Sequence, residues 1–168
     1  CTASNGDVIY LLPGHAENLT AADTVDCDVA GVTIVGLGRG GLIPTFTSTA
    51  AAGSITVDAA NVTIQNIKRV ANFATGTTAG LTISANGDGC TVDGVHFRDT
   101  SATSEFLVHI AVATTVSDLW IKNCTFVTAA GSLTNSILFA GTSVDAVIEN
   151  CYFYVDSADS VIDHAAGA

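Results

Sequence analysis

The sequence predicts an all-β protein: a right-handed, single-stranded parallel β-helix of about six to seven coils, with 26–30 residues and three short strands per coil. Three observations support this prediction. One segment recurs five times, a second strand pattern recurs in step with it, and a Gly/Asn position occupies one register of the repeated segment. We therefore expect a single β-helix domain over residues 1–168.

The repeated segment predicts one strand of each coil. Apolar residues alternate with polar ones, as Val62 and Ile64 alternate with Thr63 and Gln65, and this two-residue period is typical of a strand with one buried face. Successive repeats begin 27 to 30 residues apart. The five repeats span residues 32–37, 62–67, 90–95, 119–124 and 146–151.

Two further strands are predicted in each coil. A short alternating segment precedes every repeat, at residues 27–29, 55–57, 81–83, 108–110 and 137–139. An aromatic residue follows three of the repeats, at Phe97, Phe126 and Phe153, always three residues beyond the Gly/Asn position. Leucine-rich repeats would instead require a Leu-x-x-Leu-x-Leu pattern, which this chain lacks.

The Gly/Asn position predicts a sharp turn between the second and third strands. Gly and Asn tolerate a positive φ at the lowest cost, and stacked Asn side chains can hydrogen-bond from coil to coil. We call this column the turn ladder; it consists of Gly36, Asn66, Gly94, Asn123 and Asn150.

Both ends of the chain suggest incomplete coils. Residues 6–14 form an opening strand and turn, and residues 161–164 begin a coil that the sequence does not finish. Since an uncapped β-helix edge promotes aggregation, we expect further chain or a partner at the C-terminal side.

Composition argues against several classes of partner. A net charge of −11 with only five scattered basic residues disfavours nucleic acid, since phosphate binding needs clustered Lys or Arg. The sequence has no apolar run of 18 residues, so we expect no membrane span. The five cysteines lack metal-binding spacings. Cys124 and Cys151 occupy the same repeat position, which predicts stacked free thiols and folding in a reducing cytosol.

No catalytic, cofactor-binding or metal site is predicted. The four histidines do not group, and no nucleophile motif is present. Asp93, Lys122 and Glu149 are predicted to lie in one outward line, about 4.8 Å apart. That line could be a base flanked by acids, as in an enzyme acting on polysaccharides. It could equally be an exposed charge ladder of opposite signs, which is the simpler interpretation.

A change in the outward positions predicts an interface. The repeated segment carries Thr33, Thr63 and Thr91 outward in early coils, and Trp120 and Val147 in later ones. The preceding strands carry an outward column that we assign to Thr56, Thr82, His109, Leu138 and Ile162. Adjacent outward apolar residues mark association surfaces, so the candidate interface is His109, Trp120, Leu138 and Val147. The alternatives for this surface are that His109 is merely exposed, and that residues 99–105 or 128–135 cover the apolar face.

Six segments resemble pectin-lyase-like β-helix proteins encoded by tailed bacteriophages. They are residues 6–17, 28–38, 44–47, 55–64, 71–73 and 97–101. The resemblance implies a non-enzymatic virion structural protein that decorates or cements a capsid, or forms part of a head or tail fibre. It further implies a homotrimer, contact with the major capsid protein or another virion protein, and a place on the virion surface after assembly in the host cytoplasm.

A second function stays open beside this one. Many parallel β-helices act on acidic polysaccharides, so the chain could be a polysaccharide-binding or depolymerising module of a tailspike. Released reducing ends or unsaturated products would distinguish this function from a purely structural one.

Overall fold

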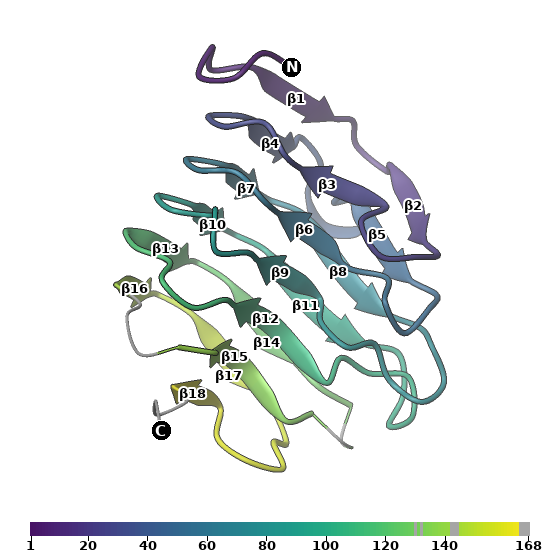
Figure 1. Ribbon diagram of the computed structural model, residues 1–168. Helices are drawn as coiled ribbons and strands as arrows, with labels where there is room; N and C mark the ends of the chain where they lie inside the picture. The colour runs from purple at the N-terminus through teal and green to yellow at the C-terminus, as the bar shows by residue number, and fades with distance from the viewer. Residues whose placement is uncertain (130, 132, 142–144, 165–168) are drawn as a thin grey trace.

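A computed structural model describes residues 1–129, 131, 133–141 and 145–164 (Figure 1). The chain forms a parallel β-solenoid whose strands lie in three sheets of six strands each. Sheet A contains β1 (Val8–Leu11), β4 (Thr33–Gly36), β7 (Thr63–Gln65), β10 (Thr91–Asp93), β13 (Leu119–Lys122) and β16 (Ala146–Glu149).

The other two sheets follow the same order along the chain. Sheet B contains β2 (Ala16–Leu19), β5 (Thr45–Ser48), β8 (Lys68–Ala71), β11 (His96–Asp99), β14 (Thr125–Val127) and β17 (Tyr152–Tyr154). Sheet C contains β3 (Val25–Cys27), β6 (Ile55–Val57), β9 (Leu81–Ile83), β12 (Val108–Val112), β15 (Asn135–Phe139) and β18 (Ile162–His164). The only helical element among the described residues is the 3-10 turn η1 (Gly40–Leu42), and no helix there is long and apolar enough to cross a bilayer.

The register of sheet A confirms the alternation predicted for the repeated segment. Ile34 pairs with Ile64, and Val92 pairs with Ile121, so the apolar positions stack inward from coil to coil. These side chains are buried in one continuous core that all three sheets share. The outward column of Thr33, Thr63, Thr91, Trp120 and Val147 also pairs in the predicted register.

The predicted strands of sheet C are wrong by two residues at two places. The first strand is Val25–Cys27 rather than residues 27–29, since Val25 pairs with Ile55. Later, Ile110 rather than Val108 pairs with Leu81. A two-residue slip keeps the same residues on the inner face, so the alternation alone could not detect it. The outward column of sheet C is therefore Asp26, Thr56, Thr82, Ala111, Leu138 and Asp163.

Sheet B places one aromatic column inside the solenoid. Phe97 stacks on Phe126 with ring centroids 5.1 Å apart, and Phe126 stacks on Phe153 at 4.6 Å. Both pairs are nearly parallel, at 4°. The same register continues through Arg69 to Phe46, so an arginine occupies one inward position of a column of phenylalanines.

Arg69 is fully buried, and its guanidinium binds backbone oxygens rather than a carboxylate. Nε donates to Gly80 O at 2.8 Å, Nη1 to Phe46 O at 2.9 Å, and Nη2 to Gly53 O at 3.1 Å. Nη2 also donates to Ser48 Oγ at 2.8 Å. Burial lowers the pKa of Arg69 to about 9, so the group keeps its charge at neutral pH. Arg69 thus ties together three chain segments inside the core.

The turn ladder forms at four of its five predicted positions. Asn66, Gly94, Asn123 and Asn150 have φ values of 53°, 63°, 55° and 50°. Asn150 Nδ2 donates to Asn123 Oδ1 at 2.7 Å, and Asn123 Nδ2 donates to Asp93 Oδ1 at 2.7 Å. The ladder of side chains therefore continues through Asp93, because Gly94 has no side chain to offer.

Gly36 does not adopt the predicted left-handed conformation. It is the last residue of β4, it is buried, and it pairs with Leu11 as ordinary strand. A Cβ at this position would collide with the Asn66 carbonyl oxygen, and Asn66 Nδ2 donates to Gly38 O at 3.0 Å across the same turn. Gly36 is needed because the next coil approaches closely, not because of its φ.

A second left-handed column precedes the strands of sheet A. Gly31, Asn61, Gly89 and Asp118 have φ values of 79°, 58°, 69° and 53°. Gly31, Asn61 and Gly89 lie two residues before their sheet A strands, and Asp118 lies directly before β13. This column turns the chain from sheet C into sheet A, as the turn ladder turns it from sheet A into sheet B.

Asn123 offers a test of the turn ladder. Asn123→Ala is expected to lower the free energy of unfolding by about 2 kcal/mol, since alanine tolerates a positive φ less well than asparagine and since the change removes two hydrogen bonds. Asn123→Gly is expected to lose only about 1 kcal/mol, because glycine accepts that φ. Urea denaturation followed by circular dichroism measures both. Equal losses for the two variants would show that the backbone conformation contributes nothing.

All five cysteines are free thiols, as predicted for Cys124 and Cys151. Contact with Cys151 and burial raise the pKa of the Cys124 thiol.

At the chain ends, β1 of the opening coil pairs with β4, and β18 pairs with β15. The prediction of an unfinished coil at residues 161–164 extends to residues 165–168, and these four lie outside the described residues.

Candidate interaction surfaces

Trp120 and Val147 form an apolar column on the outer face of sheet A. They pair directly across β13 and β16, and they are 42% and 39% exposed. Such exposure shows that neither residues 99–105 nor the described part of 128–135 covers them. The two residues stand on a rigid sheet in the predicted positions, and we call them the sheet A patch.

His109 is not part of this surface. In β12 and β15, Val108 pairs with Asn135 and Ile110 pairs with Ile137. His109 and Ser136 lie between these two pairs, and both side chains are buried. His109 Nδ1 and Ser136 Oγ are 3.2 Å apart and hydrogen-bonded. The prediction that His109 faces outward is therefore wrong, because the strand loses its alternation here.

The His109 ring lies among three phenylalanine rings. Its centroid is 5.5 Å from those of Phe97 and Phe126, and 5.8 Å from that of Phe106. This complete burial lowers the pKa of His109 to about 3. The imidazole is thus neutral and belongs to the core.

Leu138 lies on a different face from Trp120. It points outward from sheet C, pairs with Ala111 and is half-buried. Ile162, assigned to the same outward column, instead pairs with the core residue Ile137, and Asp163 takes the outward position. The apolar trend predicted for this face therefore stops at Leu138.

Sheet B carries a candidate interaction surface that the sequence interpretation missed. Tyr152 and Tyr154 are 59% and 66% exposed on β17. With Val127 and Arg98 from the preceding coils, they line a shallow hollow of about 340 Å³. We call these four residues the sheet B patch. A signal was present, since residues on either side of the inward Phe126 and Phe153 must point outward.

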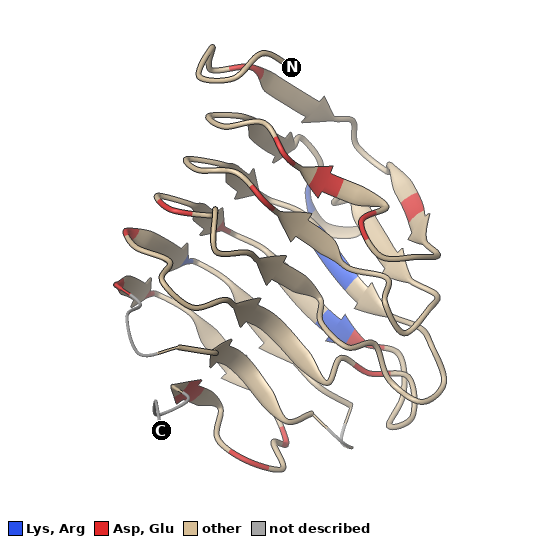
Figure 2. Ribbon diagram, viewed as in Figure 1, with Lys and Arg blue, Asp and Glu red and all other residues tan. Residues whose placement is uncertain are grey.

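The outer face of sheet B is also the basic face of an acidic protein. Its two outward columns contain Lys68, His96 and Arg98 but no Asp or Glu. Figure 2 shows Lys and Arg on β8 and β11, with further basic residues in the loop before β5 and on β13, whereas acidic residues gather mainly in the turns. Within the described part of the chain, none of these three side chains has a hydrogen-bond or ion-pair partner.

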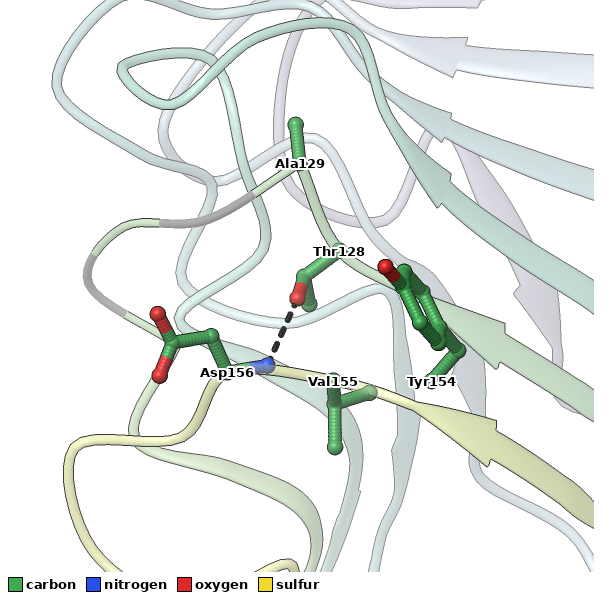
Figure 3. Close-up of a pocket in the computed structure, with 5 residues that line it drawn as sticks. All are labelled: Thr128, Ala129, Tyr154, Val155 and Asp156. Carbon is green, nitrogen blue, oxygen red and sulfur yellow. Dashed lines mark hydrogen bonds between the residues drawn. The ribbon is translucent and has the colours of Figure 1, made fainter.

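A second hollow, of about 370 Å³, lies where sheet B runs into its C-terminal loops (Figure 3). Thr128, Ala129, Tyr154, Val155 and Asp156 line it. The Asp156 amide donates to Thr128 Oγ1 at 2.9 Å, which joins the two neighbouring loops. The hollow offers one carboxylate and two hydroxyls, and this donor set suits polar contacts.

The outward line of Asp93, Lys122 and Glu149 has the predicted register. Asp93 accepts hydrogen bonds from Asn123 and from Gln65 Nε2, the latter at 3.2 Å. Lys122 makes no ion pair with either acid within the described residues. These contacts match a charge column on a strand face, with Asp93 integrated into the turn ladder.

Asp99 is the carboxyl with the largest pKa shift on sheet B. Desolvation raises its pKa to about 6, and Glu105 adds a smaller contribution. The Phe106 amide donates to Asp99 Oδ1 at 3.1 Å, so the carboxylate fixes the start of the segment that leads to sheet C.

Among the described residues, no three His, Cys, Asp or Glu side chains are placed to hold a metal ion.

Comparison with protein-family models, curated proteins and solved structures finds no match to this chain. The fold and its surfaces therefore carry the functional argument, and the resemblance to phage β-helix proteins remains an expectation from the sequence.

Proposed function

We propose that this chain is a non-enzymatic structural protein of a virion, which decorates or cements a capsid or forms part of a head or tail fibre. The exposed pair Trp120 and Val147 carries the self-association part of this proposal. Exposed aromatics on a rigid face lose little side-chain entropy on binding and form the centres of interfaces. The virion assignment, at the virion surface after assembly in the host cytoplasm, is supported by the resemblance in the sequence.

The proposal includes a right-handed coil and a homotrimer. Crossovers between parallel strands of one sheet are right-handed in about 98% of cases, which supports the handedness. We propose about six to seven coils for this chain, supported by repeats 27 to 30 residues apart. Three short strands per coil and a rigid elongated core suit a protein that associates side by side.

Self-association is tested by the mass of the purified chain. Sedimentation equilibrium is expected to give about three times the chain mass of 17.0 kDa. Trp120→Asp is expected to weaken association at least about 30-fold, since a central aromatic contributes about 2 kcal/mol or more. Thr33→Asp, in the same outward column three coils away, is the matched control and should leave the mass unchanged. A wild-type monomer at every concentration would contradict the proposal.

The virion role needs its own test. Intact particles of the virus that encodes the chain are expected to carry it through a density gradient, and antibodies should reach it on the particle surface. Particles that lack the chain would overturn the assignment, whatever its mass in solution.

A polysaccharide-binding or depolymerising module is the second candidate. The observation that favours it is the hollow formed by Arg98, Tyr152 and Tyr154, because tyrosine rings can pack on sugars and a guanidinium can bind a carboxylate. Incubation with acidic polysaccharides tests it. Reducing ends or unsaturated products would establish this function, and neither products nor binding would exclude it for the sugars used.

A further inference from the structure

The sheet A patch and the sheet B patch lie in the same coils of the solenoid. β13 leads directly into β14, and β16 leads directly into β17. Only the turn ladder residues Asn123 and Asn150, each with one cysteine, separate the paired strands. Trp120 and Val147 therefore sit on one side of this corner, and Val127 and Tyr154 sit on the other side at the same level.

The net charges of the two outer faces are of opposite sign, since sheet A carries Asp93, Lys122 and Glu149 whereas sheet B carries Lys68 and Arg98. Arg98 lies in the coil of β10 and β11, and Asp93 lies in that same coil on the face of sheet A. Asp93 accepts hydrogen bonds from Gln65 and Asn123 but has no cationic partner among the described residues. Two copies placed side by side at one level would bring Arg98 of sheet B toward Asp93 of sheet A.

Packing of either face on itself is disfavoured. The outward line of sheet A carries two carboxylates, Asp93 and Glu149, and one ammonium, Lys122, so sheet A on sheet A would oppose two surfaces of net negative charge. Sheet B on sheet B would oppose Arg98 and Lys68 with their own counterparts. Like charges facing each other across an interface oppose association, whereas opposite charges set its register.

We propose that the sheet A patch of one copy packs on the sheet B patch of a second copy, with the rods parallel and level. This inference rests on the proposed self-association and names its two surfaces. The first copy then keeps a free sheet B patch and the second a free sheet A patch, so the contact is heterologous and repeats around a closed ring. Three copies form the smallest such ring, and the turn ladder corner between the two sheets faces its axis.

Mixing two variants tests this contact. Trp120→Asp disables the sheet A patch, and Tyr154→Asp disables the sheet B patch; both residues are exposed, and melting curves check that both variants fold. Each variant alone is expected to be monomeric. A 1:1 mixture is expected to form a heterodimer of twice the 17.0 kDa chain mass, since one intact pair of patches remains.

The outcomes separate the alternatives. If Tyr154→Asp associates like the wild type while Trp120→Asp does not, sheet A packs on itself and the inference is wrong. If the mixture stays monomeric well above the concentration at which the wild type assembles, the two patches do not meet. A monomeric wild type would overturn the proposed self-association as well.

Cross-linking gives a second measurement. In a Cys1→Ser background, the double variant Val147→Cys/Tyr154→Cys is expected to form covalent oligomers under mild oxidation, because the two new thiols meet across the interface. Either single variant should remain monomeric on a non-reducing gel, as should the background itself. Dimers of the Val147→Cys single variant would again indicate packing of sheet A on itself.

Discussion

Arg69→Ala is expected to lower the free energy of unfolding by about 4 kcal/mol. The change removes the guanidinium's hydrogen bonds to the carbonyl oxygens of Phe46, Gly53 and Gly80, and a hydrogen bond from a charged donor contributes about 1.5–3 kcal/mol. It also opens a cavity in the aromatic column, beside the Phe106 ring that lies 5.6 Å from the guanidinium carbon. Urea denaturation followed by circular dichroism measures the loss.

Two variants separate volume from hydrogen bonding at this position. Arg69→Phe fills the space and extends the stack between Phe46 and Phe97, so about half of the loss is expected to remain from the lost guanidinium hydrogen bonds. Lys68→Ala removes a charge from the outer face of the same strand and should cost less than about 0.5 kcal/mol. If Arg69→Ala were as stable as Lys68→Ala, the guanidinium would not hold the core together.

Acidification is expected to destabilise the protein through His109. Between pH 7 and pH 4, the free energy of unfolding should fall by about 3 kcal/mol more in the wild type than in His109→Leu/Ser136→Ala. The pKa of His109 is about 3 in the folded chain and 6.5 in the unfolded chain. The unfolded state therefore binds the extra proton below pH 6.5, and stability is lost as the pH falls from 6.5 toward 3.

The comparison between these two proteins isolates His109 from the other titrating groups. The pKa of Asp99, raised to about 6, acts in the opposite direction, since the folded state binds its proton first as the pH falls below 6. Asp99 is present in both proteins, so its contribution cancels in the difference. Parallel stability–pH curves for the two proteins would show that His109 does not control the acid response.

Sheet A could be predicted from the sequence, whereas the strand positions of sheet C could not. The sheet A strands contain the repeated segment, and their strict alternation and the adjoining Asn66, Asn123 and Asn150 turns fix the register. In sheet C, residues 108–112 alternate equally well in two registers that differ by two residues. Only pairing with β9 and β15 decided between them.

The candidate surface was predicted in part. Trp120 and Val147 interrupt a column of threonines, and that change could be recognised in the sequence. Tyr152 and Tyr154 could have been found from their position beside the inward Phe153. His109 could not be placed, because its burial depends on the Phe97, Phe106 and Phe126 rings, which come from other strands and a loop.

The sequence alone determined the repeat, the parallel β-solenoid and the sharp turns after sheet A, because alternation and left-handed residues are local properties that recur with each coil. Tertiary structure decided that Arg69 and His109 belong to the core, since their partners lie in other strands and loops. It also brought the sheet A and sheet B patches to one level on either side of a corner. Which residues meet between neighbouring coils depends on the register of strand pairing. Side-chain alternation has a period of two residues and therefore fits registers that differ by two residues equally well.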